Sequence, residues 1–317
     1  DQGQAQFGYR CWWNLPALPK MNFQTPQVQD YFLDVGRYWL EQGIDGWRLD
    51  VPLEIEDLTF WDRFRTMVKE VNPEAYIVAE IWEEAQKWVE DGGPFDAVMN
   101  YYLGKPILNF FLGNSLDAAT IADNNYRDLK PITLQEFQKT IQQVLATYSH
   151  ETFCRQMNVL TSHDTPRLLN LAGGDSVPGQ LALAFLALLP GAPCYYYGEE
   201  IGLPGAHDPD CRRGYPEQLT TEQRRIKDFH GKVIAIRQKD QRLQTGKFRW
   251  YHNADSELLL FERFFDGGPA AICAINTTAA SQTLPKDLPG KADFSLSASG
   301  SCEGSEGKLS PGEIRLW

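Results

Sequence analysis

The chain has 317 residues, of which 43% are hydrophobic and 23% charged, as in an ordinary globular protein with a sizeable core. Its formal net charge of −12 at pH 7 argues against a basic surface for phosphate backbones, so we predict no nucleic-acid partner. The longest apolar stretch, residues 181–198, is broken by Pro190 and Gly191 and is too short to cross a bilayer. We therefore predict no membrane span, and interpret this stretch as a buried helix followed by a buried strand.

The cysteines are widely scattered and form no C-x-x-C pair. They are Cys11, Cys154, Cys194, Cys211, Cys273 and Cys302. This spacing favours free thiols in a reducing compartment, so we expect a cytoplasmic protein, with secretion as the alternative. The first residues, "DQGQAQFGYR", have neither an initiator Met nor the features of a signal peptide, which indicates a start that is either processed or truncated.

Residues 1–24 have no hydrophobic periodicity and are predicted to be a long loop. From residue 25 to about 240, amphipathic stretches of helical length alternate with short apolar runs. We predict helices over 25–43, 58–72, 82–92, 134–149, 178–190 and 221–239, and strands over 44–49, 75–80, 95–100, 157–162 and 192–198. Such alternation is typical of a parallel sheet with helical crossovers.

After residue 245 the pattern changes to short alternating segments separated by Gly, Pro, Asn and Ser, which predicts a small antiparallel β-domain. The preceding part has five strand–helix units, whereas a complete (β/α)8 barrel has eight. If the fold is a barrel, about three units lie upstream of residue 1.

Three acidic residues follow predicted strands: Asp50, Glu80 and Asp164. Because the carboxyl ends of parallel strands form one face, we expect these side chains to converge there. Crowded carboxyl groups can divide their roles, one keeping its proton while its neighbour stays ionised. A pair about 5 Å apart, in which one group attacks an anomeric carbon and the other protonates the leaving oxygen, is what retaining glycosidases use.

Arg48 precedes Asp50 by two residues and therefore shares its face of the strand. The apolar residues around this pair predict a strand buried on both faces, with Arg48 keeping Asp50 ionised. Taken alone, such a pair is more often a structural ion pair than a functional one, and a histidine such as His163 is more often an ordinary loop histidine. The matching strand-end positions of Glu80 and Asp164 favour a functional site instead.

Other chemistry-bearing residues are weaker signals. The segment 206–211, "AHDPDC", has the residue types of a metal site but no partner cluster, so we predict a loop that lines a cleft and no metal. Trp82, two residues after Glu80, is predicted to stack on a sugar ring, whereas Trp88 is predicted to pack in the core.

Three segments, in chain order, resemble the conserved strand ends of the α-amylase family of glycoside hydrolases: "GWRLDVP" at 46–52, "IVAEIW" at 77–82 and "VLTSHDTPR" at 159–167. "LPKMN" at 18–22 and Glu54 resemble the neopullulanase, cyclomaltodextrinase and maltogenic amylase branch. The resemblance implies an α/β fold, a (β/α)8 TIM barrel with strands four to eight in this chain, followed by a small antiparallel β-sandwich. The implied domains are the end of an inserted loop domain (1–24), the C-terminal part of the catalytic barrel (25–243) and the β-sandwich (244–317).

Carried over residue by residue, the resemblance implies that Asp50 is the nucleophile, Glu80 the general acid/base and Asp164 the carboxylate that grips sugar hydroxyls. It implies substrate-binding roles for Arg48, His163, Trp82 and Glu54. No cofactor is certain, and calcium is expected, if anywhere, in the N-terminal part that precedes these residues.

The implied activity is retaining hydrolysis of α-glucosidic bonds in cyclodextrins, pullulan or maltooligosaccharides, with an α-glucan oligosaccharide as partner. The alternatives are transglycosylation and a truncated, non-catalytic glucan-binding fragment. Because a partial barrel leaves unpaired strand edges, we also expect a homo-oligomer or a complementing N-terminal segment.

Overall fold

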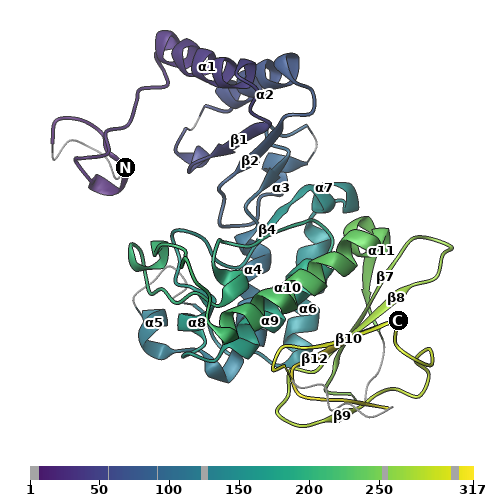
Figure 1. The fold of residues 1–317 in the computed structure, drawn as a ribbon. Helices are drawn as coiled ribbons and strands as arrows, with labels where there is room; N and C mark the ends of the chain where they lie inside the picture. Colours follow the sequence, from purple (N-terminus) through teal and green to yellow (C-terminus); the bar gives the residue numbers. More distant parts are fainter. Residues whose placement is uncertain (1–6, 56, 91, 123–127, 252–255, 301–306) are drawn as a thin grey trace. The chain divides into compact units, whose positions relative to one another are not determined.

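The computed structural model describes residues 7–55, 57–90, 92–122, 128–251, 256–300 and 307–317 (Figure 1). The chain divides into two compact units, residues 1–81 with 87–96 and residues 82–86 with 97–317. The part of the N-terminal loop prediction that covers residues 1–6, and the prediction for Cys302, fall outside the described residues.

The first unit combines two parallel strands with two helices (Figure 1). They are β1 (Gly46–Leu49), β2 (Tyr76–Ala79), α1 (Pro26–Glu41) and α2 (Leu58–Val71), preceded by the short 3-10 helix η1 (Trp12–Asn14). Proline opens α1, and Asp57 caps α2 by accepting a hydrogen bond from the Thr59 N–H at 2.9 Å. The two helices approach closely at Gly36, where a Cβ would lie 2.8 Å from side-chain atoms of both Phe64 and Met67.

Strands β1 and β2 pair in register from Gly46 opposite Tyr76 to Leu49 opposite Ala79. Their backbones meet at Gly46, where a Cβ would lie 2.1 Å from the Tyr76 carbonyl oxygen. The prediction that β1 is buried on both faces is wrong, since Leu49 is buried but Gly46, Trp47 and Arg48 are half-buried.

The second unit has a helical layer around a second pair of parallel strands. Its longer helices are α4 (Tyr101–Phe111), α6 (Leu134–Thr147), α9 (Ser176–Leu188) and α10 (Thr221–Lys239). Its shorter helices are α5 (Ala118–Ala122), α7 (His150–Arg155), α8 (Leu168–Leu171) and α11 (Gln241–Thr245). Helix α9 packs against both α4 and α10 and is buried from Gly179 to Leu188, as the apolar stretch predicts.

The parallel strands of this unit are β4 (Met157–Val159) and β5 (Ala192–Cys194). The segment that follows β3 (Ala97–Val98) joins β4 through a parallel bridge between Met99 and Met157. The positions of all five predicted strands are thus confirmed. The predicted burial of the last one is wrong: β5 is exposed to half-buried, because within the described residues only β4 hydrogen-bonds to it.

Two helix predictions need correction. Helix α4 is absent from the prediction because Gly104 and Pro106, which normally break helices, lie inside it. Gly104 is needed there, since a Cβ would lie 2.4 Å from the Val159 carbonyl oxygen of β4. The helix predicted over 82–92 shortens to a single turn, α3 (Gln86–Val89).

The C-terminal strands, yellow-green in Figure 1, form an antiparallel sheet in the order β10-β12-β8-β7-β6. They are β6 (Lys247–Trp250), β7 (Leu259–Phe264), β8 (Ala271–Ile275), β10 (Phe294–Ser297) and β12 (Glu313–Leu316). A second, two-stranded sheet pairs β9 (Gln282–Thr283) with β11 (Lys308–Leu309). Leu260 and Ala274 of the large sheet share one buried cluster with Leu309 of the small one, so apolar burial joins the two sheets.

Two further observations bear on the sequence predictions. No helix in the described part of the chain is long and apolar enough to cross a membrane. Every cysteine in that part, that is Cys11, Cys154, Cys194, Cys211 and Cys273, is a free thiol.

Candidate functional site

In the first unit, Arg48 bridges the two carboxylates that follow β1 and β2. One guanidinium nitrogen lies 2.5 Å from Asp50 Oδ1, and the other lies 3.2 Å from Glu80 Oε2. Asp50 and Glu80 are the first residues beyond the paired positions Leu49 and Ala79, so the strand register itself brings them to one edge. Because a guanidinium has several donors in a rigid plane, it can hold two carboxylates at once.

The two carboxylates differ in their access to water. The Asp50 side chain is 75% exposed, whereas that of Glu80 is 5% exposed. The expectation that Arg48 and Asp50 form a buried pair is therefore wrong for Asp50, which projects beyond the end of β1. The exposed Asp50 carboxylate is open to a ligand from solvent. The buried Glu80 carboxylate can contact only a ligand group that enters its site.

Val51 supplies a contact that the sequence analysis missed. Its backbone N–H donates to Glu80 Oε2 at 3.2 Å, and its backbone is left-handed, with φ of 39°. A β-branched residue rarely adopts this conformation, and such strain gathers at functional sites. The turn directs the N–H toward Glu80 as the chain leaves Asp50, and no sequence pattern signals it.

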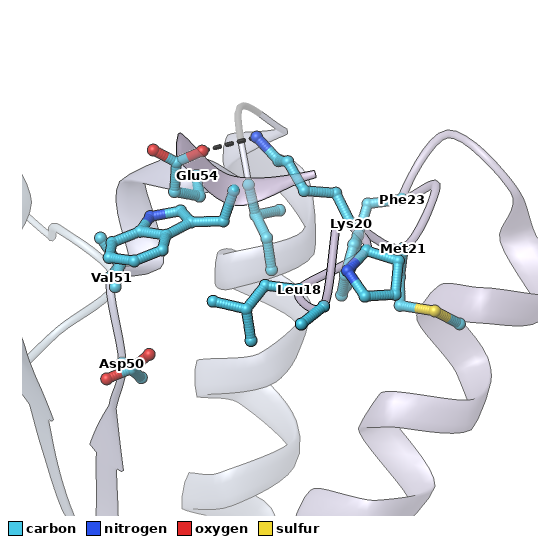
Figure 2. A pocket seen from close by; sticks show the side chains of 11 residues that line it. Leu18, Lys20, Met21, Phe23, Asp50, Val51 and Glu54 are labelled. Atoms are coloured by element: carbon cyan, nitrogen blue, oxygen red, sulfur yellow. Dashed lines mark hydrogen bonds and ion pairs between the residues drawn. The ribbon is translucent and has the colours of Figure 1, made fainter. Parts of the chain in front are cut away.

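A pocket of about 440 Å3 opens beside Asp50 (Figure 2). It is lined by Trp12, Ala17, Leu18, Pro19, Lys20, Met21, Phe23, Asp50, Val51, Glu54 and Ile55. Lys20 and Glu54 form an ion pair of 2.5 Å across it, which ties the "LPKMN" segment to the short 3-10 helix η2 (Pro52–Glu54). Asp50 and Glu54, two residues predicted to belong to the site, thus share one pocket with residues of the N-terminal segment.

In the second unit, Asp164 lies in a loop after β4, and its carboxylate contacts two nitrogen-bearing side chains. His163 Nε2 is 3.2 Å from Asp164 Oδ2, and Arg212 Nη2 is 3.2 Å from Asp164 Oδ1. Arg212 also donates to the His163 carbonyl oxygen at 3.0 Å. The sequence analysis missed Arg212, although its place directly after the acidic segment 206–211 was a signal.

The segment 206–211 contacts this loop and the arginine that pairs with Asp164. Asp208 pairs with Arg212 at 2.7 Å, Asp210 pairs with Arg213 at 2.7 Å, and the Cys211 thiol donates to the His163 carbonyl oxygen at 3.0 Å. Over the described residues, no cluster of three or more His, Cys, Asp or Glu side chains is arranged to hold a metal ion.

The two tryptophans predicted in this region have different surroundings. Trp82 is half-buried and stacks on Tyr101 with ring centres 3.9 Å apart, so one ring face is already covered. Trp88 is 8% exposed and packs against Phe95, which confirms its core role. A sugar-stacking role for Trp82 stays a prediction.

Asp50 and Glu80 belong to the first unit and Asp164 to the second, so the convergence of all three stays a prediction. What identifies the chain is the match of residues 4–256 to the family model described as the α-amylase catalytic domain. The chain belongs to the α-amylase family. Membership implies a (β/α)8 barrel for the catalytic domain.

Several proteins of the α-amylase family are similar to this chain in sequence and structure. Neopullulanase 2 of Thermoactinomyces vulgaris is 35% identical over 87% of this chain and 44% of its own length. A cyclomaltodextrinase of a Bacillus species is 40% identical over 74% of this chain and 39% of its own length. Among solved structures, the debranching enzyme of Nostoc punctiforme in its native form has a TM-score of 0.85 and 37% identity, over 99% of this chain and 66% of that chain. The chain thus spans less than half the length of these curated relatives.

Proposed function

We propose that the chain carries the catalytic face of a retaining α-glucan hydrolase. The observation that carries the proposal is the bridge from Arg48 to both Asp50 and Glu80 at adjacent strand ends. It supplies what double displacement needs, namely two carboxyl groups on one edge with different environments. Family membership supports a glycosidase, and the names of the relatives favour cyclodextrins, pullulan or maltooligosaccharides as substrates.

In the proposed mechanism, exposed Asp50 attacks the anomeric carbon while Glu80 gives its proton to the leaving glycosidic oxygen. The bond between the sugar and Asp50 is then broken by water, from which Glu80 takes a proton, so the anomeric configuration is retained. The contacts from Arg48 and the Val51 N–H fit the ionised Glu80 of this second step. Asp164, held by His163 and Arg212, would bind the hydroxyls of the same sugar ring.

A second candidate, transglycosylation, is favoured by the pocket beside Asp50. Its lining includes the apolar side chains of Trp12, Leu18, Met21 and Phe23, which suit the apolar face of a sugar better than a lone water molecule. In that reaction a sugar hydroxyl replaces water in the second step. The third possibility, glucan binding without cleavage, requires none of the contacts around Glu80.

Incubation of maltotriose with the chain, followed by time-resolved product analysis, tests these candidates. Shorter products with retained anomeric configuration support hydrolysis, and products longer than maltotriose support transfer. If maltotriose binds but is not cleaved, the catalytic proposal is wrong for this chain. Asp50→Asn is the matched control and should abolish both kinds of product while leaving binding intact.

We further propose the domain organisation implied by the sequence: residues 1–24 as the end of an inserted loop domain, 25–243 as barrel and 244–317 as a β-sandwich. The antiparallel sheet supports the last assignment, as does the apolar cluster that it shares with Leu309 of β11 and with Leu284, which follows β9. A cytoplasmic location is proposed from the free thiols and from the relative named intracellular maltogenic amylase of Bacillus subtilis, which is 34% identical over 78% of this chain.

A further inference from the structure

Glu199 is a buried carboxylate that links two ends of one loop. It begins the 3-10 helix η4 (Glu199–Ile201), five residues after β5, and its side chain is 1% exposed. It accepts a hydrogen bond from Thr161 Oγ1 at 2.8 Å and from the Leu168 N–H at 3.3 Å. Thr161 lies near the start of the loop that carries His163 and Asp164, two residues after β4, and Leu168 is the first residue of α8, where the loop ends.

Hydrogen bonds within the loop are local and fix its central turn only. The Ser162 N–H donates to Thr165 Oγ1 at 2.9 Å, and the Asp164 N–H donates to Ser162 Oγ at 3.1 Å. Neither bond spans the loop from end to end. Glu199 does so, because its two contacts lie seven positions apart in the sequence.

The surroundings of Glu199 disfavour the ionised form of its carboxyl group. Burial, with a smaller contribution from nearby Glu200, raises its pKa to about 7. The hydrogen bonds from Thr161 and Leu168 and the charge of Arg167, whose guanidinium is 4.0 Å away, oppose this shift. Arg167 is itself fully buried and donates to the carbonyl oxygens of Tyr197 and Cys211. An apolar side chain at this position would avoid the cost of burial but would leave the Thr161 hydroxyl and the Leu168 N–H without this acceptor.

We propose that Glu199 is a positioning residue that clamps both ends of the loop 161–168 and thereby sets the place of Asp164. The catalytic importance of this clamp rests on the proposed function, whereas the clamp itself can be measured without activity.

Amide hydrogen exchange of the full chain, at mildly alkaline pH where Glu199 is ionised, tests the clamp. Glu199→Gln replaces the acceptor pair by one acceptor and one donor, and should make the segment 161–168 exchange about tenfold faster. Segments of α10 should not change. The matched control is Glu200→Gln, because half-exposed Glu200 accepts from the Gly198 N–H and touches neither end of the loop. Exchange of 161–168 within about twofold of the wild type in a folded Glu199→Gln variant would overturn the proposal.

If Glu199→Gln does not fold, the Thr161→Val variant tests the clamp instead. It removes one hydroxyl donor at nearly constant volume, and should speed exchange of 161–168 about threefold, a smaller change because the Leu168 contact remains. Unchanged exchange in this variant would also count against the clamp.

Turnover of maltotriose, measured as kcat and its pH profile, would not change in this way if Glu199 had a purely structural role. Glu199→Gln should lower kcat about tenfold with little change in KM, and should remove the part of the wild-type pH profile that has its midpoint near pH 7. The same midpoint in both proteins would contradict the positioning role. A wild-type chain that cleaves nothing refutes the proposed function, and the exchange measurement then still decides the clamp.

Discussion

Arg48 on β1 and Glu80, directly after the neighbouring strand β2, meet at 3.2 Å although they are 32 positions apart in the sequence. The same guanidinium also pairs with Asp50, so one side chain contacts both candidate catalytic carboxylates. The consequences of this arrangement can be measured.

Arg48→Lys should lower kcat about 100-fold, because a lysine ammonium is a single point charge that cannot bridge two carboxylates in a fixed plane. The matched control in the same unit is Arg37→Lys, whose exposed pair with Glu70 at 3.7 Å should have no effect on turnover. Steady-state kinetics on maltotriose measure both. Equal activity of the two variants would show that the bridge has no role in turnover.

Glu80→Gln should suppress hydrolysis of ordinary maltooligosaccharides by a factor of about 100 to 10,000, because an amide cannot donate the proton that the leaving oxygen needs. Substrates with activated leaving groups need little acid assistance and should lose far less in the bond-breaking step. The control is Glu74→Gln, since Glu74 is exposed before β2. Equal losses on both kinds of substrate would rule out the acid role.

His230 should make the chain less stable in acid. It is 2% exposed, neither ring nitrogen has a hydrogen-bond partner within the described residues, and burial lowers its pKa from 6.5 to about 3. Between pH 6.5 and 3 the unfolded chain binds a proton that the folded one does not, so stability falls as pH falls, by up to about 1.4 kcal/mol per pH unit.

Urea unfolding at several pH values measures this slope, and His230→Phe should flatten it, since Phe can keep the edge contact with Tyr195. His150→Phe is the control, because His150 is exposed at the surface, where its Nε2 lies 2.8 Å from the Thr245 carbonyl oxygen. A slope that His230→Phe leaves unchanged would mean that other groups cause the acid sensitivity.

Substitution of alanine for two helical glycines should change the stability of the chain in opposite directions. Gly104→Ala in α4 puts a Cβ 2.4 Å from the Val159 carbonyl oxygen and should destabilise the chain by about 1–3 kcal/mol. Gly231→Ala in α10 meets nothing within 4 Å and should stabilise it by about 0.5–1 kcal/mol, since alanine favours helix. Thermal unfolding of both variants gives the comparison. A loss of stability in both would mean that α10 is more closely packed than the structure shows.

The positions of the parallel strands, and the acidic residues that follow them, could be predicted from the amino-acid sequence alone. Short apolar runs such as 75–80 lie between two amphipathic helices and have the length of a buried strand, which is too short for a helix. For this reason β1 to β5 could be predicted. The order of the three conserved segments also determined the family, because motif order is a property of the chain alone.

Other features of the fold and the site could not be predicted in this way, because they depend on contacts between residues that are distant in the sequence. Gly104 and Pro106 look like helix breakers until the approach of β4 makes a glycine necessary in α4. The exposure of Asp50, the left-handed turn at Val51 and the contacts of Arg212 and Glu199 likewise follow from which backbone lies beside which. Local pattern records the propensity of each segment, whereas packing, register and burial are set by contacts between segments, and those exist only in the folded chain.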